Sequence, residues 1–533
     1  MKRNLSMLLA GLLVLVMASP LYAAPDIKVN GQIRTRLRYW VDIDLDSDLK
    51  TGADRRYFDN RTRLGVDAKL SDGVRAVIQL EKYFDFGNIG PNSAASPTTG
   101  PGGSALATPG TSRQEPYIRQ AFIDFAIPGL SEEGIRFQAG RSFFRVGNGF
   151  LWGNSLTGED GATLYGPLGP GDFKIRYAMT QNQSNAQGGR ARFGDNELSH
   201  WAVDYKFDVA EKQNVEIYFV GQRDRAVDNF STLITSPTGA KVRHGDDFWV
   251  GGAYTGVAGP IALKAEIIGQ FGSTRKDVCF TSSGVATFTP AVAPVLSPIT
   301  GATTTLGTAA SSTCSSTPTL TDIDRKGALF AYGEATYKVT PAWNVGMSFT
   351  FATGDDDPTD DEYNNFVAPL AEFTTAPTRV WTDSQFFFGN RTGRSIGNAT
   401  TNRQFNFWGR GTVDIDSGTK FTTGDNGTAY SPGLFDLQFK TKYTFNKEVT
   451  GLFNIIPTWA ANKPDGQGRY MGTEIDGKIA YKPYKNLLIN TYFGYFFSGG
   501  FFDVDPAGTA FVTGTTTDAD DAWMFRTEAI VTF

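Results

Sequence analysis

Arginines recur at every second position in two segments near the start of the chain. They are Arg34, Arg36 and Arg38 in the first segment and Arg61 and Arg63 in the second. An extended strand sends alternate side chains to opposite faces, so this spacing gathers the guanidinium groups on one face of each strand. Guanidinium groups bind carboxylates and phosphates through paired, charge-assisted hydrogen bonds. The pattern therefore indicates a surface that attracts anionic solutes.

The faces opposite these arginines are apolar. The apolar sets are Ile27, Val29, Ile33, Leu37, Tyr39 and Val41, and then Leu64, Val66, Ala68 and Leu70. If such strands cross a membrane, the arginines must face the lumen, because an Arg facing lipid at the midplane costs about 2–4 kcal/mol. We expect the pore-lining basic residues to be Arg34, Arg36, Arg38, Arg61, Arg63, Arg75 and Arg141.

Arg141 fits this set only if the strand around it is irregular. In the segment 135–145, the phase set by Ile135 and Phe137 would direct Arg141 toward lipid. A β-bulge inserts one extra residue and reverses the phase of the residues after it. We therefore expect a bulge at Gly140 that returns Arg141 to the lumen.

The two cysteines of the chain, Cys279 and Cys314, lie in one segment rich in Thr, Ala, Ser and Pro that covers residues 273–327. Such a composition cannot build a packed core and is typical of a long loop. In an exported protein, two cysteines in one loop form a disulfide most simply. We expect a bond between Cys279 and Cys314.

A second long segment, 354–433, begins with clustered carboxylates. Asp355, Asp357 and Asp361 supply the oxygen ligands that Ca²⁺ prefers, but Pro358 and the spacing do not match an EF-hand loop. Two interpretations stay open, namely a calcium site and an acidic surface that is only solvated. No other metal or cofactor is expected.

Catalytic chemistry finds little support in this sequence. The only histidines are His200 and His244, and no serine is spaced to form a dyad or triad with either. No Cys-x-x-Cys-His motif is present, so a haem would have to belong to a partner protein. We expect the chain not to be an enzyme, and we expect His200 to lie at the membrane interface.

Alternating segments like the first two recur along the whole chain and predict an all-β transmembrane barrel of about 18 antiparallel strands. Beyond the first three strands they cover 117–127, 135–145, 160–166, 173–180, 199–207, 213–223, 248–255, 261–272, 328–339, 343–353, 434–445, 449–459, 471–482, 487–497 and 522–533. The segment 160–166 is weakly apolar, and 402–408 would replace it if it were not a strand.

Short and long connections alternate between these segments. The short ones are 71–73, 128–134, 167–172, 208–212, 256–260, 340–342, 446–448 and 483–486, and the long ones are rich in Gly, Ser, Thr, Asp and Asn. Outer-membrane barrels have short periplasmic turns and long outer loops. This alternation predicts that both termini lie in the periplasm.

Composition and the N-terminal segment agree with an exported barrel. The chain of 533 residues holds 60 Gly, 41 Phe, 20 Tyr and 9 Trp, and its mean hydropathy is −0.25. A basic start, an apolar run from Leu5 to Ala18 and the sequence Leu21-Tyr22-Ala23 predict a cleaved signal peptide at 1–23. As a membrane anchor, this run would be too short. We expect one barrel domain over 24–533 in the outer membrane of a Gram-negative bacterium.

The expected partners are those of an exported barrel with a basic inner face. The net charge of −5 argues against nucleic acid. The last strand alternates and ends on Phe533, which resembles the signal that the bacterial barrel-assembly machinery reads. Expected partners are therefore that machinery, outer-membrane lipid with lipopolysaccharide, and an anionic solute.

Several short stretches resemble the alginate-export family of outer-membrane proteins. They are Asn60-Arg61-Thr62-Arg63-Leu64-Gly65-Val66, Gly140-Arg141-Ser142, Gly354-Asp355-Asp356-Asp357-Pro358 with Asn365-Phe366 and Pro369, and Gly472-Thr473-Glu474-Ile475-Asp476-Gly477. The resemblance implies a monomeric barrel whose arginines attract an anionic polyuronate. Carried over residue by residue, it reaches Arg61, Arg63 and Arg141.

The charge pattern departs from a lumen that is basic throughout. In the first three strands the inward side chains Lys28, Arg34, Arg36, Arg38, Arg61, Arg63, Lys69 and Arg75 outnumber Asp67 and Glu81. In later strands acidic and basic inward residues are near balance, so only one wall is basic. The sequence predicts a channel for a polar, anionic solute such as an acidic saccharide, with a non-conducting or gated barrel that sheathes a partner as the alternative.

Overall fold

The computed structural model describes residues 25–41, 55–86, 116–130, 134–153, 158–182, 197–224, 244–278, 319–354, 362–364, 366, 433–462, 468–501 and 521–533. The segment 1–23, both cysteines, the carboxylates Asp355, Asp357 and Asp361, and the segment 402–408 lie outside these residues. The predictions made for them stay predictions.

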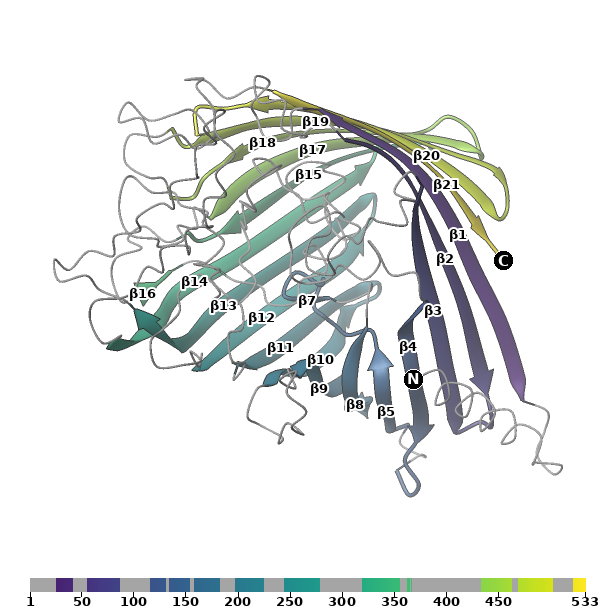
Figure 1. Cartoon of the computed structure of the whole chain (residues 1–533), viewed down its shortest axis with the longest axis vertical. Coiled ribbons are helices and arrows are strands. Elements are labelled where there is room, and N and C mark those ends of the chain that lie inside the picture. Colours follow the sequence, from purple (N-terminus) through teal and green to yellow (C-terminus); the bar gives the residue numbers. More distant parts are fainter. Residues whose placement is uncertain are drawn as a thin grey trace, which may run out of the picture.

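Eighteen antiparallel strands form one closed barrel (Figure 1). They are β1 (Asp26–Val41), β2 (Arg55–Lys69), β3 (Val74–Phe86), β4 (Tyr117–Ala126), β5 (Arg136–Ser142), β8 (Glu159–Leu168), β9 (Gly171–Asn182), β10 (Glu197–Ala210), β11 (Gln213–Asp224), β12 (His244–Ala258), β13 (Ile261–Val278), β14 (Thr319–Lys338), β15 (Trp343–Ala352), β17 (Leu434–Thr444), β18 (Val449–Trp459), β19 (Tyr470–Tyr484), β20 (Leu487–Ser498) and β21 (Ala522–Thr532). The predicted fold class and strand number are confirmed.

The period-two pattern explains why these segments form barrel strands. In β1, Arg34 and Arg36 are buried, whereas their neighbours Ile33 and Leu37 are 40% and 42% exposed. The same alternation continues around the barrel, where apolar side chains such as Ile217, Val250 and Ile267 are exposed. An apolar outside and a polar inside are the inverse of a soluble sandwich and are typical of a barrel in lipid.

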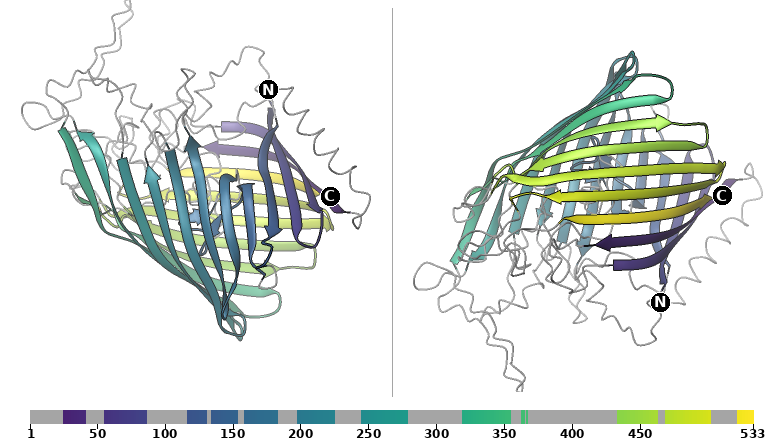
Figure 2. Two further views of the ribbon diagram at one scale, coloured as in Figure 1. Left: turned by 90° about the horizontal axis from the view of Figure 1, so that it is seen from below. Right: turned by 90° about the horizontal axis from the view of Figure 1, so that it is seen from above.

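The connections alternate in length as the sequence predicts. Short turns at 70–73, 127–135, 169–170, 211–212, 259–260, 339–342, 445–448 and 485–486 all join strands at one end of the barrel. The connections at the other end are longer. Figure 2 shows the blue and teal strands β8–β13 on the opposite side of the barrel from the green and yellow strands β17–β21.

The barrel closes where β1 pairs with β21. Gly31 and Phe533 exchange backbone hydrogen bonds at this seam, with N···O distances of 2.8 and 3.1 Å. A side chain at position 31 would overlap the ring of Phe533. The terminal aromatic therefore packs over a glycine of the first strand, which ties the two ends of the barrel wall together.

Three short elements were not predicted from the sequence. β6 (Arg145–Val146) and β7 (Trp152–Gly153) form a small hairpin between β5 and β8, and β16 (Glu362–Tyr363) pairs in parallel with β14. The segment 160–166 is part of β8, so no replacement strand is needed. None of the described segments is a helix of the length and apolarity that crossing a membrane requires.

The bulge predicted at Gly140 is wrong. The pairing of β5 runs from Arg136 to Ser142 against β8 without a register shift, and Gly140 pairs directly with Phe122 of β4. Gly140 instead adopts a φ of 120°, in a place where a Cβ would overlap the backbone of Ala121. The glycine is needed for close backbone approach, and it does not change the phase of the strand.

Candidate functional site

A cluster of largely buried arginines covers the inner face of β1–β4, and we call it the basic wall. Its members are Arg34, Arg36, Arg38, Arg61, Arg63 and Arg119. Arg34 and Arg61 lie directly opposite each other on β1 and β2. Two guanidinium groups in such a pair repel each other, so a solute or neighbouring group that is negative is favoured here.

Asp59 holds together the half of the basic wall that lies toward the long connections. Its carboxylate lies 2.8 Å from Arg36 Nε and 3.0 Å from Arg38, and all three side chains are almost completely buried. A buried carboxylate between two guanidinium groups offsets part of the cost of taking those charges out of water.

Glu81 plays the same role on β3. Arg63 Nε and the Tyr117 hydroxyl donate to its carboxylate, and Arg119 lies 3.6 Å away. The Arg119 guanidinium also stacks over the ring of Phe143, 4.3 Å from its centroid. Asp59 and Glu81 thus each contact two arginines of the basic wall.

Sequence reasoning missed Arg119. The register between β3 and β4 shifts between Gln79 and Leu80, where Leu80 pairs with Ile118 and Gln79 with Gln120. This shift leaves Arg119 as an extra residue that turns inward, where it is buried. A period-two count over 117–126 gives no sign of the shift, so the sequence held no signal for this residue.

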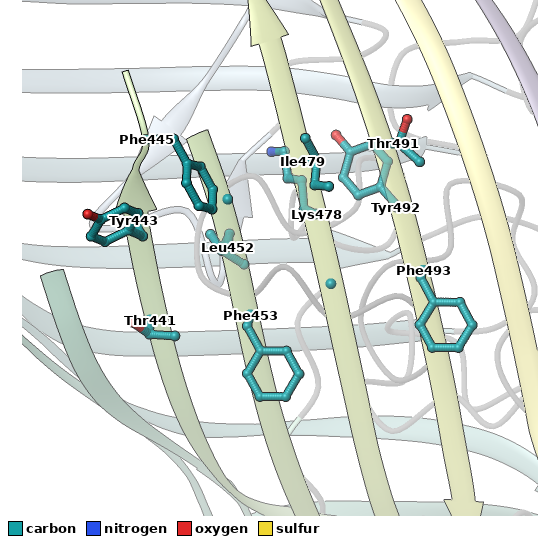
Figure 3. A pocket seen from close by; sticks show the side chains of 12 residues that line it. Thr441, Tyr443, Phe445, Leu452, Phe453, Lys478, Ile479, Thr491, Tyr492 and Phe493 are labelled. Carbon is teal, nitrogen blue, oxygen red and sulfur yellow. The ribbon is translucent and has the colours of Figure 1, made fainter. Parts of the chain in front are cut away.

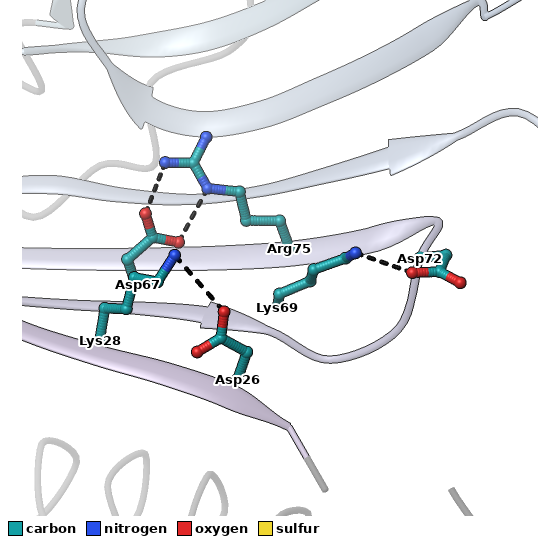
Figure 4. Close-up of polar contacts among 6 residues, drawn as sticks. All are labelled: Asp26, Lys28, Asp67, Lys69, Asp72 and Arg75. Atoms are coloured by element: carbon teal, nitrogen blue, oxygen red, sulfur yellow. Dashed lines mark hydrogen bonds and ion pairs between the residues drawn. The ribbon is translucent and has the colours of Figure 1, made fainter. Parts of the chain in front are cut away.

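Arg75 lies on the inner face too, but at the turn end of the barrel. Figure 4 shows its guanidinium in a two-point ion pair with Asp67, with N···O distances of 2.8 and 2.7 Å. Both side chains are partly exposed. Nearby, Lys69 donates to Asp72 in the turn at 2.7 Å, and this hydrogen bond lowers the pKa of the Asp72 carboxyl.

Arg141 is on the opposite face from the one predicted. It pairs with Ala121, which shares a face of β4 with the 51% exposed Ile123. Its guanidinium makes a two-point ion pair with Asp160 of β8, at 2.8 and 2.6 Å. Arg141 therefore faces outward at the end of β5 that leads into the longer connection. There its charge is paired with the carboxylate of Asp160, and it does not line the lumen.

The wall across from the arginines carries carboxylates, and the connection between β5 and β8 folds inward onto them. Gly147 N donates to Glu216 Oε1 at 2.8 Å, and Asn148 N donates to Glu266 Oε2 at 2.7 Å. Tyr218 also donates to Glu266. We call residues 143–153 the inward loop, because these contacts fix it against the inner faces of β11 and β13.

Aromatic packing completes the seat of the inward loop. Phe150 packs against Phe330 and Tyr332 of β14, with ring centroids 5.0 and 4.6 Å apart. Trp152 lies 5.7 Å from the ring of His200, and both are fully buried. His200 accepts or donates one hydrogen bond with Gln222 at 2.8 Å. It is thus an inner packing residue, and its predicted place at the membrane interface is wrong.

Metal binding finds no support in the described part of the chain. Among those residues, no group of three or more His, Cys, Asp or Glu side chains is arranged to hold a metal ion. The side chain of His244 is outside this part, as are the expected calcium ligands.

Comparison with protein families finds no match, and comparison with curated proteins finds none either. Solved structures give weak overall similarity over 95% of this chain. Pseudomonas aeruginosa OccK9 (OpdG) has 12% identity and a TM-score of 0.46 over 98% of its chain, and Acinetobacter baumannii OccAB4 has 11% and 0.46 over 98%. P. aeruginosa OpdK, solved with vanillate, has 9% and 0.43 over 98% of its chain. Similarity of this size says nothing about function.

Proposed function

We propose that this protein is an outer-membrane channel for a polar, anionic solute such as an acidic saccharide. One observation carries the proposal: the inner face of a closed barrel bears the basic wall, in which six arginines gather on the strands β1, β2 and β4. Fixed positive charge along a pore raises the local concentration of anions and speeds their entry.

The membrane assignment rests on the outer face. Exposed apolar side chains from nearly every strand surround the barrel, and closed barrels are one of only two architectures that satisfy every backbone group in lipid. The short turns at one end support an orientation with both termini in the periplasm. A monomer in the outer membrane, assembled by the barrel-assembly machinery through the Phe533 strand, accords with the closed seam.

A non-conducting or gated barrel is the second candidate, and burial favours it. Arg34 and Arg61 are 0% and 1% exposed, and Arg36 is paired with Asp59 at 2.8 Å. Arginines that line an open pore would be hydrated. In the second candidate, the basic wall holds a packed lumen together, and the barrel serves as a sheath for a partner.

Reconstitution in planar bilayers separates the two candidates. An anion-selective channel gives stepwise increases in current. In a salt gradient, the reversal potential of this current shifts toward the equilibrium potential of the anion. Selectivity falls as salt rises, since the screening length shortens from about 10 Å at 0.1 M to about 3 Å at 1 M. A barrel that inserts but never conducts would overturn the channel proposal.

Arg61→Gln tests the basic wall itself. This change removes one charge without breaking an ion pair, because the Arg61 guanidinium donates to the neutral side-chain amide of Gln32. We expect the reversal potential at low salt to move toward zero. Arg141→Gln makes the same change in charge on the outer face and should leave the reversal potential unchanged.

A further inference from the structure

An open groove lies across the outer face of β17, β18, β19 and β20 (Figure 3). Its volume is about 370 Å³. The lining residues with outward positions are mainly apolar, and they include Tyr443, Phe445, Phe453, Ile479 and Phe493. The groove is thus distinct from the basic wall, which lies inside the barrel.

Gly477 forms the open floor of the groove, while the ring of Phe445 lies over Gly451, 3.0 Å from where a Cβ would be. Gly477 pairs with Phe453 on one side and Phe493 on the other, and Gly451 pairs with Tyr443 and Ile479. A Cβ placed on Gly477 would meet no atom within 4 Å, so no side chain of the protein fills that space. A glycine within a strand often marks a place where a ligand comes close to the backbone.

Large side chains form the sides of the groove. Phe445, Ile479 and Phe493 are 63%, 56% and 47% exposed, and they stand on either side of the glycine floor. The apolar side chains that line the groove have no protein atoms to contact across it. A flexible hydrocarbon chain in the groove would supply these dispersion contacts along its length. The occupant that matches this shape and chemistry is a lipid acyl chain.

Basic residues gather at one end of the groove. Lys447 lies in the turn between β17 and β18, and Lys485 lies in the turn between β19 and β20, so both are at the same end of the barrel. Both are exposed, as is Lys482, while Glu448 is the one acidic residue described in these two turns. Exposed Lys and Arg side chains near a membrane surface attract anionic lipid headgroups.

We propose that the groove over Gly477 binds one anionic glycerophospholipid. One acyl chain lies along the glycine floor between Phe445, Phe453 and Phe493, and the phosphate headgroup lies near Lys447 and Lys485. The inference rests on the membrane assignment of the proposed function, with the turn end in the periplasmic leaflet. It does not depend on whether the barrel conducts.

Native mass spectrometry of the detergent-purified full chain, mixed with defined lipids, tests this site. The probes are phosphatidylglycerol and phosphatidylcholine with identical acyl chains. We expect the protein to retain one phosphatidylglycerol in preference to phosphatidylcholine. Gly477→Leu fills the groove without backbone strain, because its φ is in the ordinary range for strands, and should lower retention about tenfold.

Gly269→Leu is the matched control. Gly269 pairs with the outward Val250 in the interior of β13, and a Cβ there meets only one atom, at 3.9 Å. It adds the same side chain to the outer face outside the groove, so phosphatidylglycerol retention should equal that of the wild type. Equal retention by the wild type, Gly477→Leu and Gly269→Leu would overturn the site.

A second variant covers the case in which Gly477→Leu does not fold. Lys447→Gln with Lys485→Gln leaves the groove intact and removes the headgroup charges. We expect it to bind both lipids alike, because the preference for phosphatidylglycerol is lost. An undiminished preference in this variant, or tighter binding of lipopolysaccharide than of phosphatidylglycerol by the wild type, would contradict the proposal. A barrel that binds the lipid but never conducts would refute only the channel.

Discussion

At the scale of single residues, burial decides how much an ion pair contributes. Asp59 is 2% exposed and forms ion pairs with Arg36 and Arg38. Asp59→Asn removes the negative charge from between two buried guanidinium groups, and breaking a buried pair in this way costs about 3–5 kcal/mol. We expect the refolded barrel to unfold at a clearly lower urea concentration than the wild type. The folded fraction at each urea concentration is measured by gel electrophoresis without heating, in which folded and unfolded chains differ in mobility.

Asp67→Asn provides the comparison on the same strand. Asp67 and Arg75 form an equally close two-point pair, yet their side chains are 28% and 46% exposed. Exposed pairs contribute about 0–1 kcal/mol. Its urea midpoint should stay near that of the wild type. Similar losses in the two variants would show that burial does not govern these pairs.

The sequence predicted the faces of most of these residues, and it failed where the regularity of a strand was misjudged. The period-two pattern was enough to place Arg34, Arg36, Arg61 and Arg63 on the inner face. Arg119 could not be placed, because the register shift beside it in β4 reverses what simple counting implies. Arg141 was placed on the wrong face because we expected a bulge, whereas the regular β5 keeps it on the outward face that simple counting gives. Hydrogen-bond register depends on the neighbouring strands and is not encoded in one segment alone.

At the scale of elements, the inward loop is the part of the site that no sequence pattern predicted. It contains Gly147, Gly149 and hydrophobic residues that look like any turn or strand end, and only contacts with distant strands fix its place. Asn148 and Glu266 are separated by 118 positions in the chain. Strands follow from local alternation, whereas the seat of a loop depends on partners that come together only after the barrel closes.

Glu266→Ala should release the inward loop. It removes the acceptor for Asn148 N and for the Tyr218 hydroxyl, while Glu216 continues to hold Gly147. A buried donor left without a partner costs about 1–3 kcal/mol. We expect faster proteolysis within 143–153 and, if the barrel conducts, a larger and noisier single-channel current.

Glu266→Gln is the control for this release. The Gln carbonyl oxygen still accepts from Asn148 N, so the protease pattern should stay close to that of the wild type. If Glu266→Gln and Glu266→Ala were cleaved equally fast, the negative charge rather than the hydrogen bond would hold the loop.

At the scale of the whole molecule, the fold follows from a simple rule that recurs along the sequence. Alternating strands, short turns at one end and long connections at the other were enough to predict 18 strands and a closed wall. The lengths of β13 and β14 were underestimated, because they continue to Val278 and begin at Thr319, beyond the apolar alternation. Hydrogen-bonded pairing between β13 and β14 continues through these extensions. Such pairing produces no hydropathy pattern in the sequence from which it could be predicted.

The outer face gives the sharpest test of a barrel built for lipid. Leu64 and Ile217 are exposed on the outer face near the middle of β2 and β11. Leu64→Arg and Ile217→Arg should each destabilise the folded barrel in a bilayer by about 2–4 kcal/mol, because a guanidinium near the midplane is poorly solvated. Denaturant titration of folding into vesicles measures this loss.

Leu130→Arg makes the same exchange at an exposed position in the turn between β4 and β5, and it should cost almost nothing. If all three variants fold alike, the exposed apolar band does not face lipid, and the membrane assignment fails with it.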